Sequence, residues 1–401
     1  MNILVVGGGP AGLYFAIQML LRDSTHKIRI VERNAKGSTF GWGVVFSDET
    51  LQNFLAKDSV SSEEIRNALF HWDDIDIHLR GECFHSSGHG FSGIGRHKLL
   101  EILTRRAQQL GAHIEFGGEI DPSCFHEYDV VVAADGVNSG VRQRYSSAFD
   151  PEIDTRKCRY IWLGTDYLFT AFTFLFEETE HGWFQAHCYR FSDDTSTFIV
   201  ECPESVWEAA GLKEMSKDES ISFCESLFGS FLQGHKLRSN NPTVTSSDAW
   251  VQFRRVHCGR WHHENIVLLG DSAATAHYSI GSGTKLAMES AIALAEALSD
   301  GLSIPQALEI YQEKREIEVF RLQSAARNST EWFENVSLKT RLEPQRFAYS
   351  LLTRSQRVSH ESLRARDRAF LEDYEGWLIE QATGEKPNKP YPPMFIPLRI
   401  K

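Results

Sequence analysis

The stretch Ile3-Leu4-Val5-Val6-Gly7-Gly8-Gly9-Pro10-Ala11-Gly12, near the start of the chain, decides the fold. Its first residues form an apolar run of the kind that a buried parallel strand needs. From Pro10 to Leu21 the apolar residues recur with helical spacing, and Ile28 to Val31 is a second apolar run. The order strand, glycine turn, helix, strand predicts the beginning of a parallel α/β sheet.

The glycine turn matches the dinucleotide-binding pattern G-x-G-x-x-G. Gly7 permits a tight turn, Gly9 lets the backbone approach a diphosphate, and Gly12 lets helix and strand pack closely. The following helix N-terminus offers free N–H groups and a partial positive charge to phosphates. Glu32 lies 20 residues after Gly12, at the end of the second strand, where it would accept hydrogen bonds from ribose hydroxyls. Since an acidic group disfavours a 2′-phosphate, the pattern predicts bound FAD or NAD rather than NADP.

Two later segments carry related signals. Asp135-Gly136 follows the apolar run Val130–Ala133, and Gly270-Asp271 follows the run Ile266–Leu269. The turn Gly281–Thr284 then opens a helix, whose positive end would stabilise negative charge on a reduced flavin ring. Asp271 would bind a hydroxyl of the ribityl chain. Each segment alone is equally a capped turn, but together with the first motif they favour FAD.

Composition limits the class of protein. The chain has 401 residues and a net charge of −12, which disfavours nucleic acid or an anionic membrane as the main partner. Its seven cysteines include no C-x-x-C pair, so we expect reduced thiols in a cytoplasmic protein, with no metal site. The apolar N-terminal stretch lacks a basic region and contains three consecutive glycines, so we expect no signal peptide or membrane anchor.

The middle of the chain differs from both ends. Strand-like runs separated by turn residues predict an antiparallel sheet from 159 to 202, whereas 39–91 resembles long loops with one helix near 63–69 and an extended piece at 75–79. The predicted fold class is α/β with an α+β insert. The expected parts are a Rossmann-like FAD-binding domain (1–70, 95–158 and 260–335), an antiparallel-sheet substrate domain (71–94 and 159–259), and C-terminal helices with a proline-rich arm (336–401).

The three motifs resemble the single-component FAD-dependent aromatic hydroxylases of the para-hydroxybenzoate hydroxylase type. The nearest resemblance is to the salicylyl-CoA 5-hydroxylase and 2-aminobenzoyl-CoA monooxygenase group, in segments 40–48, 160–164, 260–263, 277–285 and 331–336. Tryptophan-hydroxylating flavoproteins of violacein biosynthesis share a similar segment at 41–45. The tail at 392–397 resembles the segment that leads into a fused reductase domain in bifunctional members, and we expect this chain to lack that domain.

The chain also departs from the family pattern. After Gly-Asp the family usually has Ala-Ala-His, whereas this chain has Ser272-Ala273-Ala274, with His277 three residues further on.

The resemblance implies a reaction. NADH or NADPH, bound transiently without its own Rossmann domain, would reduce FAD, and O2 would give a flavin C4a-hydroperoxide that hydroxylates an electron-rich ring. The expected substrate is an aryl thioester of the salicylyl-CoA or 2-aminobenzoyl-CoA type. One alternative is a hydroxylase of a tryptophan- or indole-derived or carrier-bound aromatic; another is a flavin reductase that transfers no oxygen. The W-x-W-x-I-P signature of flavin halogenases is absent. A monomer or homodimer is expected.

The resemblance also implies roles for single residues. His277 is the first candidate for a catalytic base, with a structural histidine as the competing interpretation, and His187 is a weaker candidate. Arg254-Arg255 would suit the phosphates of a CoA thioester, although a charged face explains it as well. The predicted cofactor-binding residues are Gly7, Gly9, Pro10, Ala11, Gly12, Glu32, Arg33, Gly43, Val44, Arg96, Asp135, Gly136, Asp271, Gly281, Gly283, Thr284 and Lys285. The predicted substrate residues, each of which also suits a core, are Val45, Trp162, Phe174, Phe184 and Tyr189.

Overall fold

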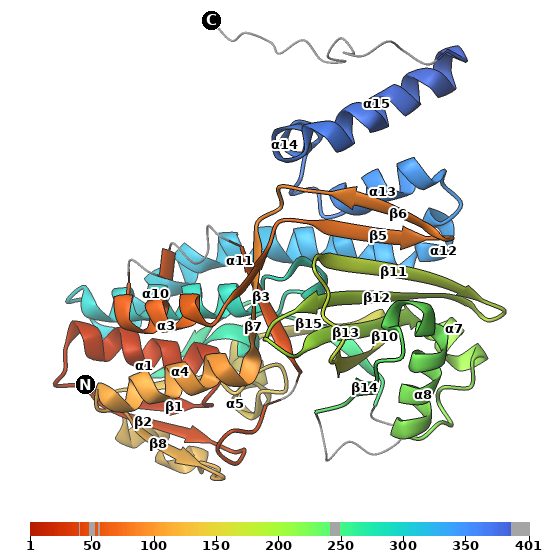
Figure 1. Cartoon of the computed structure of the whole chain (residues 1–401). Coiled ribbons are helices and arrows are strands. Elements are labelled where there is room, and N and C mark those ends of the chain that lie inside the picture. The colour runs from red at the N-terminus through yellow and green to blue at the C-terminus, as the bar shows by residue number, and fades with distance from the viewer. Residues whose placement is uncertain (40, 48–52, 55–56, 241–248, 386–401) are drawn as a thin grey trace, which may run out of the picture.

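A computed structural model describes residues 1–39, 41–47, 53–54, 57–240 and 249–385. Its strands form a six-stranded sheet, an eight-stranded sheet and a three-stranded sheet (Figure 1). The predicted proline-rich arm from 386 onward lies outside the described residues, as does Phe40 of the segment 40–48. None of the helices in the described part of the chain is long and apolar enough to cross a membrane.

The six-stranded sheet is the predicted α/β unit. Its strands run in the order β16-β17-β9-β1-β2-β8, and all neighbours are parallel except β16 and β17. Every residue of β9 is buried, as a strand covered on both faces requires. The bounds are β1 Asn2–Val6, β2 Lys27–Glu32, β8 His113–Phe116, β9 Val130–Ala133, β16 His262–His263 and β17 Ile266–Leu268.

Helices cover this sheet and share its core. One face carries α1, α4 and α10, and α1 packs against both of the others (Figure 1). The long helix α11 continues from α10 across to the second sheet, so it joins the two lobes (Figure 1). The bounds are α1 Pro10–Arg22, α3 Ser59–Asn67, α4 Arg96–Gln109, α5 Gly140–Arg144, α6 Ser146–Phe149, α10 Gly283–Ser299 and α11 Ile304–Glu334.

The eight-stranded sheet contains the predicted antiparallel block. Its order is β14-β10-β13-β12-β11-β5-β6, with β15 paired to β10; β5 and β11 are parallel and the other pairs antiparallel. β10 begins at Pro151, inside the segment assigned above to the FAD-binding domain, and its register with β15 shifts between Thr155 and Arg159. The bounds are β5 Ile75–Leu79, β6 Glu82–Ser86, β10 Pro151–Thr165, β11 Phe172–Thr179, β12 Gly182–Arg190, β13 Ser196–Pro203, β14 Leu237–Arg238 and β15 Val251–Cys258.

The two faces of this sheet pack against different helices. One face forms a core with α7 Glu204–Ala209, α8 Lys217–Leu227 and α9 Gly229–Leu232. The other face packs on α11 and the C-terminal helices, which lie at the top of Figure 1. Those helices are α12 Val336–Lys339, α13 Pro344–Thr353, α14 His360–Arg366 and α15 Arg368–Thr383.

The small sheet corrects the expectation of long loops in 39–91. Strands β3 Gly43–Ser47, β4 Phe70–Trp72 and β7 Phe91–Gly95 pair antiparallel. Gly43 faces Gly95 across the pair, and a Cβ on Gly43 would lie 2.8 Å from the Phe191 ring. These glycines therefore serve close packing within a strand, although glycine in a sequence favours a turn.

Candidate active site

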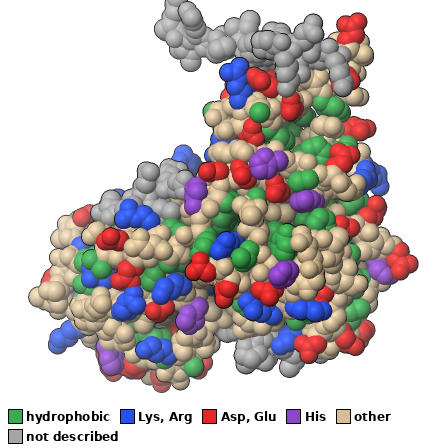
Figure 2. Space-filling view, viewed as in Figure 1, with side chains coloured by type: hydrophobic (Ala, Val, Ile, Leu, Met, Phe, Trp, Pro, Cys, Tyr) green, Lys and Arg blue, Asp and Glu red, His purple; other side chains and the backbone are tan. Residues whose placement is uncertain are grey.

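One cavity of about 2170 Å³ is lined by residues of all three sheets. It extends from the carboxyl ends of β1 and β9 to the cavity-facing side of the eight-stranded sheet. The surface is hollowed between the two lobes, with hydrophobic and basic side chains around the hollow (Figure 2). Such a crevice at the ends of parallel strands is the usual ligand position in an open α/β sheet.

The glycine turn at the end of β1 forms one end of the cavity. Gly7 has φ +109°, and a Cβ there would lie 2.3 Å from the Ala134 carbonyl oxygen. A Cβ on Gly12 would lie 2.3 Å from the Gly7 oxygen, so Gly12 holds α1 against the turn. A Cβ on Gly9, by contrast, has no described protein atom within 4 Å. The open space at Gly9 suits a ligand, which supports the roles predicted for the three glycines.

Glu32 closes this end at the tip of β2. Its Oε2 accepts a hydrogen bond from the Gly8 backbone N–H at 2.7 Å, and its Oε1 accepts from the Asn34 N–H at 2.8 Å. The carboxylate is thereby fixed beside the glycine turn, with Arg33 also on the cavity wall. An acceptor held there suits the ribose hydroxyls of an adenosine group.

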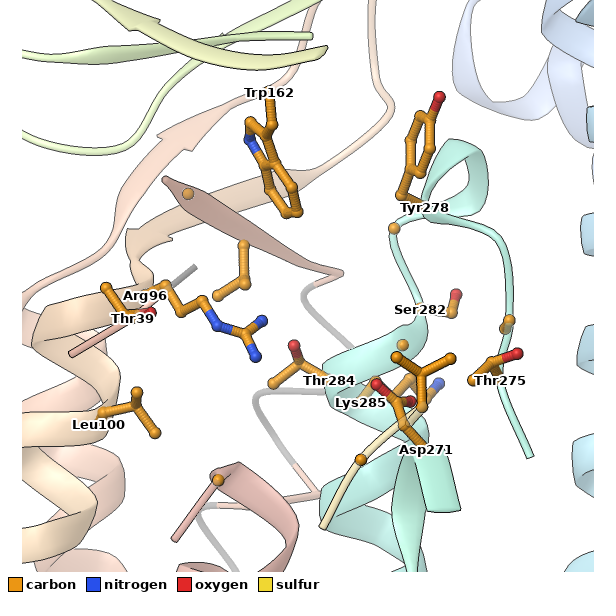
Figure 3. A pocket seen from close by; sticks show the side chains of 18 of the residues that line it. Thr39, Arg96, Leu100, Trp162, Asp271, Thr275, Tyr278, Ser282, Thr284 and Lys285 are labelled. Atoms are coloured by element: carbon orange, nitrogen blue, oxygen red, sulfur yellow. The ribbon is translucent and has the colours of Figure 1, made fainter. Parts of the chain in front are cut away.

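Two aspartates at the cavity have carboxylates that the surrounding protein satisfies only in part. Asp135 accepts from the Val141 N–H at 3.2 Å through Oδ2, while its buried Oδ1 has no partner among the described residues. Burial raises the pKa of Asp271, and Arg96 opposes that rise. Arg96 extends from α4 toward the start of α10, where Asp271 and Thr284 lie (Figure 3). Burial lowers the pKa of Arg96 in turn. The carboxylates of Asp135 and Asp271 and the guanidinium of Arg96 therefore lie where a polar ligand would satisfy them.

The turn before α10 forms the opposite wall. Gly281 has φ +61° and lies against Val45 of β3, so the N-terminus of α10 meets the strand that carries the predicted cofactor residues Gly43 and Val44. Thr284 and Lys285 of its first turn line the cavity, and Lys285 pairs with Glu289 at 3.7 Å. The helix N-terminus places a partial positive charge at this wall.

Most predicted cofactor residues meet at this cavity. Pro10, Ala11 and Gly12 do not line it, because they form the first turn of α1 behind the glycine backbone. The unpartnered Asp135 oxygen, the open space at Gly9 and the helix termini fit a flavin dinucleotide. Those that line the cavity are Gly7, Gly9, Glu32, Arg33, Gly43, Val44, Arg96, Asp135, Gly136, Asp271, Gly281, Gly283, Thr284 and Lys285.

The remainder of the cavity is an aromatic chamber against the eight-stranded sheet. Trp162, Phe174 and Tyr189 line it as predicted, and Tyr189 fixes β3 by donating a hydrogen bond to the Gly43 oxygen at 2.8 Å. Trp162 and Tyr278 lie at the side of the cavity away from Asp271 (Figure 3). Flat, apolar walls of this kind suit an aromatic guest.

Known proteins resemble the chain over nearly its whole length. It is 38% identical to a salicyloyl-CoA 5-hydroxylase of a Streptomyces species over 94% of this chain and 74% of that protein. It is 33% identical to the 3-hydroxy-4-methyl-anthranilyl-[aryl-carrier protein] 5-monooxygenase of Streptosporangium sibiricum, over 90% of this chain and 97% of that protein. The protodeoxyviolaceinate monooxygenase of Chromobacterium violaceum is 34% identical, over 87% of this chain and 93% of that protein.

The chain belongs to the single-component FAD-dependent aromatic hydroxylases. It is therefore a flavoprotein monooxygenase, and the predicted cofactor is confirmed. No family model matches the sequence.

Solved structures confirm the fold. The tetrameric form of 2-methyl-3-hydroxypyridine-5-carboxylic acid oxygenase has a TM-score of 0.69 at 18% identity, over 91% of this chain and 97% of that one. PqsL from Pseudomonas aeruginosa, a probable FAD-dependent monooxygenase, has a TM-score of 0.64 at 19% identity, over 87% and 98%. The predicted combination of a Rossmann-like domain with an inserted antiparallel sheet is correct.

Phe184 does not lie in the chamber of this hydroxylase. It is fully buried on the other face of β12, in the core with α7 to α9. Successive side chains of a strand point to opposite faces, so Phe184 cannot share a face with Tyr189 five residues on. Of the β12 residues on the opposite face, His187 and Tyr189 line the cavity.

His187 forms a buried pair with Glu201 of the neighbouring strand β13. Its Nε2 lies 3.1 Å from Glu201 Oε2, and the two side chains are 2% and 0% exposed. Burial lowers the pKa of His187, although the bond to Glu201 opposes the shift. A neutral His187 donating from Nε2 has an unprotonated Nδ1. The pair therefore presents a proton acceptor at the chamber, oriented by a carboxylate.

His277 lies behind the chamber wall. Its neighbours Ala276 and Tyr278 line the cavity, but His277 itself does not. Its Nδ1 accepts a hydrogen bond from the Ser279 N–H at 3.2 Å, and burial lowers its pKa to about 4. Its ring lies 4.1 Å from that of Tyr278. The role of base predicted for His277 stays a prediction, and the geometry offers His187 as a nearer candidate.

Three arginines of the C-terminal helices also line the chamber, and no motif in the sequence predicted them. Arg354, Arg357 and Arg366 follow or end short helices far from the flavin motifs. His187 did carry a signal, since it is a polar residue inside the buried strand β12, two residues before Tyr189. Side chains two residues apart in a strand share one face, so the predicted position of Tyr189 also places His187 in the chamber.

Proposed function

We propose that this hydroxylase acts on an aryl acyl thioester whose ring carries a hydroxyl or amino group. The observation that carries the proposal is the continuity of one cavity from the flavin residues into an aromatic chamber with a histidine–carboxylate pair. Two relatives at 33% and 38% identity bear names with a CoA-linked and a carrier-bound aryl substrate, which supports this class.

FAD, when bound, would supply the redox chemistry, namely the uptake of electrons from NAD(P)H and the activation of O2. The residues of the chain have other tasks. Trp162, Phe174 and Tyr189 hold the ring flat and keep water away from the reacting carbon, and Val45 on β3 faces the turn of Gly281. Holding the ring in one orientation replaces a random encounter by a fixed one, which is a large part of such a rate enhancement.

His187 is proposed as the group that takes the proton from the ring hydroxyl or amino group as oxygen is transferred. The proton moves from the substituent to Nδ1, and Glu201 stabilises the imidazolium through its bond to Nε2. Removing the proton makes the ring more electron-rich as oxygen is transferred. Glu201 is then a positioning residue. His277, the candidate from the sequence, does not line the cavity, so it would affect the substrate ring only through its neighbour Tyr278.

Product analysis tests the substrate class. Salicylyl-CoA and 2-aminobenzoyl-CoA are incubated with the FAD-loaded protein, O2 and NADH or NADPH, beside the free acids. Hydroxylated thioester, with free acids turned over at least tenfold less efficiently, is the expected result. Equal efficiency with the free acids would contradict the thioester proposal but not the family.

A second candidate is an indole-derived substrate, favoured by the 34% identity to the protodeoxyviolaceinate monooxygenase. Turnover of indole-derived acids, without turnover of thioesters, would select it. A flavin reductase without oxygen transfer would oxidise NAD(P)H and give no hydroxylated product from any of these compounds. Assembly as a monomer or homodimer stays a prediction.

A further inference from the structure

The C-terminal helices form one wall of the substrate chamber. The turn between β6 and β7 packs against the end of α14, where a Cβ on Gly88 would lie 2.3 Å from the Arg366 carbonyl oxygen. The Ser87 N–H donates to Asp367 at 2.7 Å, which fixes the same contact. Both Gly88 and Arg366 line the cavity. This wall is therefore held in place by the close approach of Gly88 to the Arg366 backbone and by the hydrogen bond from Ser87 to the Asp367 side chain.

The charged side chains of this wall that line the cavity are all basic, although the Asp367 carboxylate lies behind it. Arg354, Arg357 and Arg366 line it, and Arg357 and Arg366 are exposed. Among the described residues, no salt bridge joins any of the three to a carboxylate, although the protein has a net charge of −12. The carboxylates of the described cavity lining all lie at the flavin end: Glu32, Glu101, Glu119, Asp135 and Asp271.

Arg354 is the innermost of the three. Its guanidinium lies over the rings of Phe174 and Phe333, 5.0 and 5.1 Å from their centres. It donates to the Ser279 carbonyl oxygen at 2.8 Å and to Ser329 Oγ at 2.9 Å, partners that carry no charge. Burial lowers its pKa to about 10, so it stays a cation at neutral pH. The Glu201 carboxylate acts on Arg354 electrostatically, but all of the described hydrogen-bond acceptors of Arg354 are neutral. A half-buried cation with such partners attracts a polar or anionic group of the ligand.

Nearer the solvent, Arg357 and Arg366 have few partners of their own. Arg357 donates to Ser282 Oγ at 3.4 Å, a long contact. Arg366 contributes a positive charge beside buried His89, whose pKa is lowered to about 4 by burial first and by Arg366 second. His89 is therefore neutral, and the positive charge on this wall comes from the arginines. Two guanidinium groups at an opening bind phosphate well, because each offers a planar fork of donors.

We propose that Arg357 and Arg366 bind the phosphate of a phosphopantetheine arm, while Arg354 contacts the thioester carbonyl. The inference rests on the proposed function, since it assumes an acyl thioester with its ring among Phe174 and Trp162. The arm then runs outward along the C-terminal wall, from aromatic to basic surroundings. A CoA thioester and a carrier-bound thioester share this phosphate, so the chemistry is the same for both sources.

The test compares phosphate-bearing and phosphate-free forms of one substrate. The aryl group chosen by the assay above is presented as its CoA, 4′-phosphopantetheine and pantetheine thioesters, and on a phosphopantetheinylated carrier protein. The variant is Arg357→Gln combined with Arg366→Gln. The control is Arg368→Gln, because Arg368 lies two residues after Arg366, pairs with Glu372 on the surface of α15, and does not line the cavity.

The expected result is a loss of at least tenfold in kcat/KM for phosphate-bearing thioesters relative to the pantetheine thioester. The control should keep the ratio of the parent protein. Calorimetric titration with free CoA should show the same loss of affinity without turnover. A larger loss for CoA than for the carrier identifies CoA as the source, and the reverse identifies the carrier.

Two outcomes would overturn the inference. One is an equal effect on the pantetheine and CoA thioesters, which would place the arginines away from the phosphate. The other is a rise in KM for NADPH with none for the thioesters, which would assign them to the reductant. If the parent protein turned over no thioester at all, the proposed function would fail, and the calorimetric comparison would still decide whether the arginines bind phosphopantetheine.

Discussion

Replacing Gly9 by alanine separates binding of FAD from stability of the fold. Gly9 is the N-cap of α1 and has φ −77° and ψ 179°, a conformation open to any residue. Its Cβ would meet no described protein atom within 4 Å. The gain from a less flexible unfolded chain, about 0.4–1 kcal/mol, offsets the loss of a good N-cap residue of similar size. The apoprotein of Gly9→Ala should therefore unfold within about 2 °C of the parent.

FAD binding should respond quite differently. The added methyl occupies the space where the diphosphate meets the backbone, and a 100-fold weaker affinity corresponds to about 2.7 kcal/mol. At FAD concentrations of 100 times the parent Kd, bound FAD stabilises the parent by about 2.7 kcal/mol but the variant by only about 0.4 kcal/mol. The FAD-dependent rise in melting temperature should thus almost disappear in Gly9→Ala.

Gly12→Ala is the matched comparison. Its Cβ would lie 2.3 Å from the Gly7 oxygen and 2.9 Å from Val5 Cγ1, so the apoprotein itself should lose about 1–3 kcal/mol or more. Thermal unfolding with and without added FAD, together with the flavin absorbance of purified protein, measures both effects. Full FAD affinity in Gly9→Ala, or an unchanged apoprotein melting temperature in Gly12→Ala, would refute the reasoning.

Three other predictions concern the chamber. His187→Gln should lower kcat about 100-fold or more while NAD(P)H oxidation continues. Glu201→Gln should shift the acid limb of the kcat–pH profile. Unchanged product yield in both variants would rule out His187 as the proton acceptor. Phe174→Leu and Phe184→Leu should each cost about 1 kcal/mol in urea unfolding, but only Phe174→Leu should raise KM for the aromatic substrate, and equal KM values would contradict the assignment of faces. Burial lowers the pKa values of His277 and His89 to about 4. Below pH 6.5 the unfolded chain therefore binds protons that the folded chain does not. The free energy of unfolding should fall between pH 6.5 and pH 4 by up to about 3 kcal/mol for each histidine. The melting temperature of His277→Gln should fall less over that range than that of the parent, and parallel curves would argue against a buried neutral His277.

The flavin end of the site is predictable because its residues follow one another closely in the chain. Gly7 to Gly12 and Glu32 belong to one strand–helix–strand unit, and Asp135 and Asp271 each end a buried strand of the same sheet. Parallel strands bring their carboxyl ends to one edge, so local motifs predict their meeting. That much of the fold and the cofactor follows from short segments.

The substrate end is less predictable because its geometry depends on long-range packing. Phe184 and Tyr189 are equally apolar, and only the sheet decides which face each one takes. Position 43 of β3 has no room for a side chain because Phe191, far along the chain, fills the space beside it. Arg354 reaches the chamber only because α13 packs on the cavity-facing side of the eight-stranded sheet, in one core with Phe174. No local pattern in the sequence contains these facts.

The central claim is that one cavity holds FAD and an electron-rich aryl thioester together. Turnover of 2-aminobenzoyl-CoA and salicylyl-CoA under 18O2, with FAD-loaded protein and NAD(P)H, tests it most directly by mass spectrometry. We expect one hydroxylated thioester to gain a single 18O atom on its ring, in near-stoichiometric ratio to the NAD(P)H consumed. Oxidation of NAD(P)H with all of the 18O recovered as hydrogen peroxide, for both thioesters, would contradict it.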